Sequence, residues 1–555
     1  MKKIFLDFYN EIARKKAFWL PLLILVISAY AFGMLNRTIS WDDFGREKYV
    51  GEGNVMLAGR WGMVLWSKIT GTIDLNPFTD RFLAAIFLVI ASVLACLVFF
   101  SLSKKNKVWS YTILASSIVT YPLINEIWEY SGADFISCGN MCLVTLALLF
   151  VLCRTSCVRW YYWIVPSLLL LLPASSYESA IFYYLTFVAI VIFYKAFRQD
   201  KRYTIKSFFQ EGLSYCIPLV VAVLLRFVIG FVLLKIYNLS YNHGGATMLF
   251  WDLGNLFGTI KLLVLRSGFF YGIVGLVYLP ISLFVICLLV FICMVVWESI
   301  KKKKWAIIGF GSLVIVAVFF QAIVQGSSMP YRTATISLAL FEAFIFYSIC
   351  EVVLEKKCVY PCVVVCLLLV CWHQSIYINK LQSLNNLRSD NELSALRHMG
   401  YKLSSEYDTN KPIVFVTYYK SGEWINKRIR VRGDSWNERL FLTITKILMG
   451  EKASDVGDDD GIQFEDYRYV KDNLKCITRY YMDIVYGFEY LGFDLNILKP
   501  ASDETQEEYA IFEMAIKTAR EAQLKPYSIL ETDDIIIATL SSDMFFDCLG
   551  YGYIK

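Results

Sequence analysis

Long apolar runs separated by short polar connections occupy the first two thirds of the chain. A membrane-spanning helix needs about 20 consecutive, mostly apolar residues, and we interpret each run by that rule. Eleven candidate helices result, near residues 17–35, 82–103, 108–124, 135–153, 160–176, 179–195, 213–236, 270–297, 305–325, 333–354 and 358–378. The pattern therefore predicts an α-helical polytopic membrane protein with about eleven transmembrane helices.

Basic residues cluster at every second connection between these runs. They precede the first run and follow the second, fourth, sixth, eighth and tenth; residues 301–304, for example, are four consecutive lysines. Because cytoplasmic loops carry the excess of lysine and arginine, we predict a cytoplasmic amino terminus. The connections that then face outward are residues 39–67, 125–134, the turn around Glu178, 237–269 and 325–333.

The pattern changes near residue 379, after which no run is long enough to span a membrane. The expected elements are a leucine-rich helix near residues 381–396, strands at 412–418 and 534–540, and a helical region near 465–491. We therefore predict two domains. A transmembrane domain comprises residues 1–378, and a soluble α/β domain on the outer face comprises residues 379–555.

Composition supports a membrane protein and argues against other classes. The chain is 57% hydrophobic and only 18% charged, with a mean hydropathy of +0.50, which lies outside the range of soluble globular proteins. The net charge of +6 comes largely from the basic connections, so we do not infer nucleic-acid binding. Most of the 15 cysteines lie in apolar runs, where thiols behave as small hydrophobic groups. No histidine pair accompanies them, so we expect no metal site there.

The first outer connection, residues 39–67, is the stretch richest in candidate chemistry. It combines Asp42 and Asp43 with Arg46, Arg60 and Trp61. Charged side chains are expensive near hydrocarbon, so an acid-rich loop at the end of a membrane helix indicates a functional site. The alternative is an ordinary polar loop whose tryptophans lie at the lipid boundary.

Two charged residues fall inside the apolar runs. Arg226 lies midway in the run 213–236, and Glu342 lies midway in the run 333–354. Either charge costs about 2.5–3.5 kcal/mol at the bilayer centre unless it is paired or hydrated. Two explanations are open: the two residues neutralise each other across a helix contact, or Arg226 lines a cavity and meets an anionic group, with Glu342 holding it.

An enzyme acting on the outer face has no access to cytoplasmic nucleotide sugars, so its activated substrate must arrive through the lipid, as a polyprenyl-phosphate sugar does. Transfer requires a carboxylate that takes a proton from the acceptor hydroxyl and cationic groups that stabilise the departing phosphate. The candidate carboxylates are Asp42 and Asp43, with Glu126, Asp134 and Glu178 as second acids or sugar ligands. The candidate phosphate ligands are Arg46, Arg60, Arg226, Arg266 and Arg332, and Trp61 offers an aromatic face to the substrate.

Two short motifs in the first outer connection carry a family resemblance. Residues 41–46 are WDDFGR, and residues 59–61 are GRW. An initial helix followed by a WDDxxR-like loop and a GRW motif resembles the Gtr-type glucosyltransferases, which modify O-antigen and belong to the GT-C superfamily of membrane glycosyltransferases. The resemblance implies a GT-C-like fold in the plasma membrane, a polyprenyl-phosphate glucose donor and an inverting reaction. It also implies a surface polysaccharide acceptor, which can be O-antigen, teichoic acid or capsule.

The resemblance also implies roles for individual residues. Asp42 or Asp43 corresponds to the catalytic base, and Arg46 and Arg60 shape the same loop. Because adjacent side chains point apart on a helix or strand, we expect one aspartate to face the acceptor. We assign the base to Asp43 and an orienting role to Asp42. No obligatory cofactor is implied, although a divalent cation held between the two acids stays open.

Two other functions compete with the glycosyltransferase. A lipid-linked oligosaccharide flippase would need a charged cavity, for which Arg226 and Glu342 are the candidates, but it would need neither an outer acid cluster nor a large outer domain. A polysaccharide polymerase is expected to concentrate arginines in two large outer loops, whereas here they are spread singly. Convergence of the first-loop acids with Glu178 or Asp134 on one arginine-lined outer cavity would favour the glycosyltransferase.

Overall fold

The computed structural model describes most of the chain. The described residues are 2–36, 55–56, 59–72, 77–103, 107–128, 133–153, 161–198, 205–237, 256, 283–325, 331–354, 356, 358–408, 410–419, 463–464, 485, 487–489, 491–498, 506–524 and 527–541. They divide into two compact units: the first holds the described residues up to Gln382, and the second holds those from Ser383 onward.

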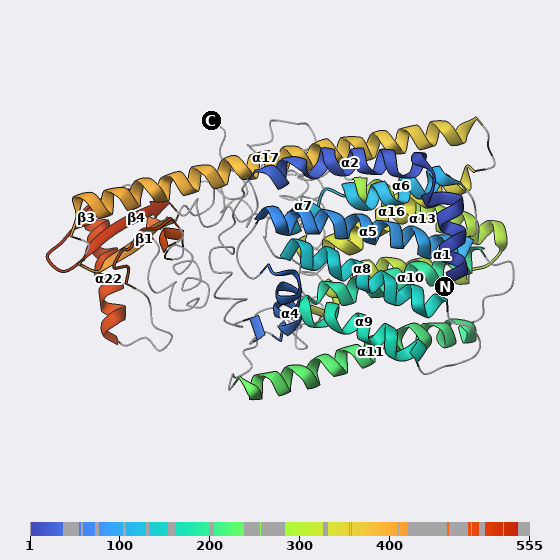
Figure 1. The fold of residues 1–555 in the computed structure, drawn as a ribbon, viewed down its shortest axis with the longest axis horizontal. Helices are drawn as coiled ribbons and strands as arrows, with labels where there is room; N and C mark the ends of the chain where they lie inside the picture. The colour runs from blue at the N-terminus through green and yellow to red at the C-terminus, as the bar shows by residue number, and fades with distance from the viewer. Residues whose placement is uncertain are drawn as a thin grey trace. The chain divides into compact units, whose positions relative to one another are not determined.

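The first unit is built from helices (Figure 1). They are α1 (Lys2–Phe8), the π-helix η1 (Tyr9–Ala13), α2 (Lys16–Leu35), α4 (Trp61–Thr70), α5 (Pro77–Ser103), α6 (Val108–Thr120), α7 (Ile124–Trp128), α8 (Ala133–Leu152), α9 (Tyr161–Ser176), α10 (Ser179–Arg198), α11 (Ile205–Ile236), α13 (Leu283–Lys302), α14 (Ala306–Val318), α15 (Phe320–Gln325), α16 (Tyr331–Val352) and α17 (Val359–Glu406). The last of these, α17, continues without interruption into the second unit.

Six described helices are long and apolar enough to cross a membrane. They are Lys16–Leu35, Phe78–Ser103, Asp134–Leu152, Ser179–Arg198, Glu211–Ile236 and Val359–Ser383. Shorter apolar helices occupy Val108–Thr120, Trp163–Ser176 and Ala306–Val318. The chain is therefore a multi-pass membrane protein. Each of the predicted apolar runs contains a described helix, but the total of eleven spans stays a prediction, because the run 270–297 begins outside the described residues.

The helices of the first unit pack into a continuous bundle. Helix α5 packs against α8, α9 lies between α8 and α11, and α6 lies between α2 and α16 (Figure 1). The ring of Phe99 in α5 stacks on Phe187 of α10 and on Phe344 of α16, with centroids 5.9 and 5.8 Å apart. The short helix α4 packs on α9. This order brings the start of α4, the turn before α10 and helix α11 into one region of the bundle.

The second unit contains a four-stranded sheet in the order β2–β1–β4–β3. The strands are β1 (Ile413–Tyr419), β2 (Gln463–Phe464), β3 (Ile529–Glu531) and β4 (Ile536–Ser541). The central pair, β1 and β4, is parallel, with Ile413 opposite Ile536, and both neighbours are antiparallel. The strands predicted at 412–418 and 534–540 are thus confirmed. Most of the helical region predicted near 465–491 lies outside the described residues.

Helices cover both faces of this sheet. Successive side chains of a strand point to opposite faces, so alternate residues of β1 pack against different helices. Ile413 and Phe415 pack with Leu396, Met399 and Leu403 of α17, which confirms the leucine-rich helix. On the opposite face, alternate residues of β1 pack with a helix that the sequence did not predict, α22 (Gln506–Glu521). The contacting pairs are Val414 and Val416 with Ala515 and Ala519.

Candidate functional site

The residues predicted for the outer site divide into three groups. Side chains are described for Arg60, Trp61, Asp134, Glu178 and Arg226. Glu126 lies in α7 and Arg332 in the first turn of α16, with side chains outside what the structure describes. Asp42, Asp43, Arg46 and Arg266 lie outside the described residues.

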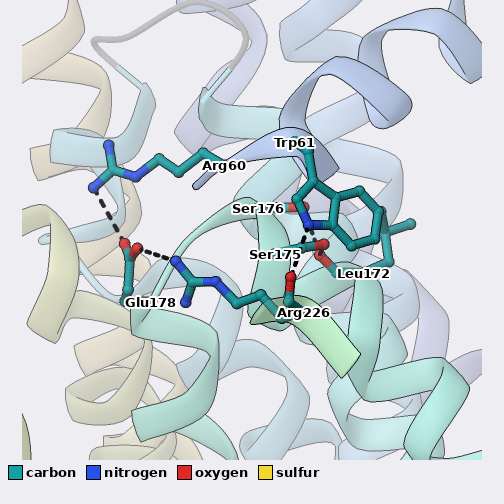
Figure 2. Close-up of polar contacts among 7 residues, drawn as sticks. All are labelled: Arg60, Trp61, Leu172, Ser175, Ser176, Glu178 and Arg226. Atoms are coloured by element: carbon teal, nitrogen blue, oxygen red, sulfur yellow. Dashed lines mark hydrogen bonds and ion pairs between the residues drawn. The ribbon is translucent and has the colours of Figure 1, made fainter. Parts of the chain in front are cut away.

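Glu178 lies between two arginine side chains (Figure 2). Its Oε1 atom accepts a hydrogen bond from Nη2 of Arg226 at 2.8 Å, and its Oε2 atom accepts one from Nη2 of Arg60 at 3.1 Å. Arg60 directly precedes α4, Glu178 lies between α9 and α10, and Arg226 belongs to α11. One carboxylate therefore joins three segments that are far apart in the sequence, and we call these residues the arginine clamp.

Close backbone packing places Arg60 in the clamp. Gly59 adopts a φ of +70°, which glycine tolerates without steric cost. The backbone N–H of Arg60 donates to the Val55 carbonyl at 3.1 Å. A Cβ atom on Gly62 would lie 2.4 Å from Oγ of Ser175 and 2.8 Å from its backbone carbonyl carbon. Helix α4 can therefore lie this close to α9 only because residue 62 has no side chain.

Trp61 fixes the other side of α4 against α11. Its Nε1 atom donates to the backbone carbonyl of Arg226 at 3.4 Å (Figure 2), and the residue is 9% exposed. A Cβ atom on Gly230 would lie 3.7 Å from the Trp61 ring, which is ordinary van der Waals contact. The described contacts of Trp61 are therefore structural, and a sugar-stacking role for its ring stays a prediction.

The charges of the clamp do not cancel. Burial alone would raise the pKa of Glu178, but the positive charges of Arg60 and Arg226 outweigh that effect and hold the pKa below its ordinary value. Glu178 is thus ionised at neutral pH, with both oxygens occupied. A general base works best with a pKa near the working pH, so Glu178 is unsuited to that role. Two guanidinium groups against one carboxylate leave the clamp with a net positive charge.

Arg60 retains hydrogen-bonding capacity after its bond to Glu178. A guanidinium group carries five N–H donors, and the Nε atom of Arg60 is buried without a hydrogen-bond partner among the described residues. The guanidinium lies 5.0 Å from the ring centroid of Tyr177, a distance at which the ring face attracts the cation. With 24% of its side chain exposed, Arg60 is the member of the clamp best able to receive an anionic ligand.

Asp134 occupies a different environment. It is fully buried in the first turn of α8, and its Oδ1 atom accepts a hydrogen bond from the backbone N–H of Phe135 at 2.7 Å. A negative charge at the amino-terminal end of a helix is electrostatically favourable. This contact gives Asp134 a part in the start of α8, and its predicted contact with substrate stays a prediction.

The expected contact between Arg226 and Glu342 is wrong. Arg226 pairs with Glu178, whereas Oε1 of Glu342 accepts hydrogen bonds from Ser117 of α6 and Gln374 of α17, at 3.1 and 2.8 Å. The two charged residues of the apolar runs therefore belong to separate polar clusters. Glu342 is 2% exposed, and its contacts hold three helices together in the interior of the bundle.

The described residues include His, Cys, Asp and Glu side chains, which are common metal ligands. These residues contain no cluster of three or more His, Cys, Asp or Glu side chains able to hold a metal ion. The divalent cation considered between Asp42 and Asp43 concerns residues outside that part of the chain.

Sequence reasoning identified the charged members of the clamp but missed the residues that position them. Gly62, Ser175 and Tyr177 were not predicted, although each lies within three residues of a predicted residue or motif. A glycine directly after the GRW motif is a signal for close helix packing. An aromatic residue directly before Glu178 is a weaker signal, because aromatics are frequent throughout this chain, at 16% of residues.

The sequence that contains the arginine clamp matches a known protein family. The family described as Glucosyl transferase GtrII matches residues 31–372, well over half of the chain, and this range includes the whole arginine clamp. The crystal structure of ArnT from Cupriavidus metallidurans bound to undecaprenyl phosphate matches with 10% sequence identity and a TM-score of 0.39, covering 77% of this chain and 87% of that chain. No curated protein matches the chain. The chain belongs to the GtrII glucosyl transferase family, and it is a membrane glycosyltransferase.

Proposed function

We propose that this glycosyltransferase moves glucose from a polyprenyl-phosphate donor to a cell-surface glycan on the outer face of the plasma membrane. The family membership supports the sugar. The apolar helices support a donor that reaches the enzyme through the lipid. The alternation of basic connections supports a cytoplasmic amino terminus, which puts the clamp and the second unit on the outer side. The acceptor is an O-antigen-like or other envelope polysaccharide.

The arginine clamp is the observation that carries this proposal. In the transfer reaction negative charge develops on the departing lipid phosphate, and preorganised cationic groups stabilise such charge. Arginine matches phosphate oxygens with paired N–H donors. Arg60 has a buried Nε donor without a partner among the described residues, and the clamp as a whole has a surplus positive charge. We assign the donor phosphate to Arg60 and Arg226, with Glu178 holding both arginines in place.

The proton acceptor must then be another group, because both oxygens of Glu178 are engaged. We assign this role to Asp43, with Asp42 orienting, in the connection that leads along the chain to Arg60. In a single displacement the acceptor oxygen bonds to the anomeric carbon as the bond from that carbon to the phosphate oxygen breaks. Asp43 takes the hydroxyl proton, the lipid phosphate leaves with the electron pair, and the anomeric configuration inverts.

Sugar transfer by the purified protein tests this function. The substrates are synthetic polyprenyl-phosphate glucose and envelope glycan, and the variants are Asp42→Asn and Asp43→Asn. Asp494→Asn is the matched control, since Asp494 is exposed in the second unit. We expect Asp43→Asn to abolish turnover while donor binding persists and the control stays active. An inactive wild type with every lipid-linked sugar, or full activity in both first-loop variants, would overturn the proposal. Chelation of divalent cations in the same assay shows whether one is required.

A further inference from the structure

Two buried side chains hold the carboxyl-terminal end of α2. Oε1 of Gln382 accepts a hydrogen bond from the backbone N–H of Gly33 at 3.0 Å. Nη1 of Arg81, from α5, donates to the backbone carbonyls of Gly33 at 2.6 Å and of Asn36 at 3.0 Å. Gln382 is 4% exposed and Arg81 is 2% exposed. Both contacts are therefore made away from water, where they contribute most to a fixed geometry.

The Gln382 contact depends on the absence of a side chain at residue 33. A Cβ atom there would lie 2.4 Å from Oε1 of Gln382 and 2.8 Å from its Cδ atom. Any larger residue would push the amide group away, although the end of a glutamine side chain can move. Gly33 thus lets Gln382 reach the backbone of α2, alongside which α17 runs (Figure 1).

Arg81 contacts backbone carbonyls that α2 itself leaves without a hydrogen-bond partner. The last carbonyls of a helix have no partner within the helix, and a guanidinium group at that end also interacts favourably with the helix dipole. Arg81 supplies this group to the Gly33 and Asn36 carbonyls. With Gln382 on the Gly33 N–H, the last turn of α2 is held from two neighbouring helices.

We infer that Gln382 is a positioning residue of the transfer reaction, acting through the end of α2. The chain leaves α2 at Asn36 and reaches Asp42 and Asp43 a few residues later, so the direction of this last turn sets where the connection begins. This inference rests on the proposed function, in which these aspartates act on the acceptor. Helix α17 would then have two roles: Gln382 positions the end of α2, and Leu396 and Leu403 contribute to the hydrophobic core beside the sheet.

A double-mutant cycle on Gly33→Ala and Gln382→Ala tests the inference. A misplacement of reacting groups by about 1 Å can cost up to 100-fold in rate, and we expect each variant to lower kcat at least tenfold while KM for the donor changes less than twofold. If the added methyl acts by displacing the amide, Gly33→Ala has no further effect in the Gln382→Ala background. Gly309→Ala is the matched control, because a Cβ atom there meets nothing within 4 Å.

Hydrogen exchange gives a second measurement that does not depend on turnover. The Gly33 amide should exchange faster in Gln382→Ala than in wild type, and at the wild-type rate in Gly309→Ala. Unchanged kcat in both test variants, beside an inactive Asp43→Asn, refutes the positioning role and leaves the proposed function standing. Additive losses in the double variant also refute it. If wild type transfers no lipid-linked sugar, the proposed function fails and the positioning role falls with it.

Discussion

Removing the carboxylate of Glu178 should damage both stability and transfer, because this side chain compensates two arginines at once. In Glu178→Ala, Arg60 and Arg226 lose their ion pairs and repel each other as neighbouring positive charges. In Glu178→Gln an amide oxygen can still accept one hydrogen bond, but the negative charge is lost. We expect both variants to weaken donor use, with the alanine variant more severely affected.

The size of the effect on stability follows from the exposure of the partners. A hydrogen bond to a charged group contributes about 1.5–3 kcal/mol. Arg226 has a side chain only 9% exposed, so its bond belongs near the upper end of that range, whereas Arg60 at 24% belongs near the lower end. We therefore expect Glu178→Ala to lower the free energy of unfolding by about 4 kcal/mol, and the melting temperature by about 5 °C.

Scanning fluorimetry of the detergent-solubilised protein, followed by the transfer assay on the same samples, measures both effects. Glu521→Gln is the control: its partner Lys517 lies 3.8 Å away, both side chains are more than two-thirds exposed, and such pairs contribute little. A Glu178→Ala protein with the wild-type melting temperature and the wild-type rate of sugar transfer would refute the clamp as a structural and functional unit.

Two further predictions concern the carboxylates of Glu178 and Glu342. The pKa of Glu178 is depressed, so its stabilising contribution is complete above the ordinary value of 4.5 and is lost as pH falls through the depressed pKa. The difference in melting temperature between wild type and Glu178→Gln should thus stay constant from neutral pH to about 5 and shrink only in more acidic solution; a difference that already shrinks near neutrality contradicts this assignment. Glu342→Gln keeps an oxygen for Ser117 and Gln374, so its free energy of unfolding should lie within about 1 kcal/mol of the wild-type value. Glu342→Leu removes both hydrogen bonds and should lower the free energy of unfolding by about 1–3 kcal/mol. Equal melting temperatures of the two variants would argue against a stabilising role of these buried hydrogen bonds.

The helices and central strands could be predicted because their signals are local. Apolar runs such as the one that forms α5, and the β-branched residues of β1 and β4, depend little on distant contacts. Helix α22 was missed although half of the residues in its sequence, QEEYAIFEMAIKTARE, are apolar and recur at helical spacing. Its buried face includes Ala515 and Ala519, four residues apart, and two alanines give a weak hydrophobic signal although they suit close packing on a sheet.

The partners of charged residues could not be predicted in the same way. The sequence predicts Arg60, Glu178 and Arg226 as candidates, but pairing Arg226 with Glu342 assumed that both lie at the same depth in the membrane. Helix α11 begins eight residues before the apolar run used for that estimate. Its 32 residues extend about 48 Å at 1.5 Å per residue, well beyond the ~30 Å hydrocarbon core. A central position within an apolar run therefore did not determine the depth of Arg226.

Two arginines, Arg60 and Arg226, share the single carboxylate of Glu178. If Glu178 served only to neutralise Arg226, the pair would be complete, and a second guanidinium beside it would be an added electrostatic cost. Arg60 nevertheless shares the carboxylate, and the packing of Gly62 against Ser175 holds its helix in place. Its Nε donor is buried without a partner among the described residues, and a buried donor in that state costs about 1–3 kcal/mol. Under the proposed function, the phosphate of the lipid-linked sugar would bind this donor during turnover, and that binding would offset the cost.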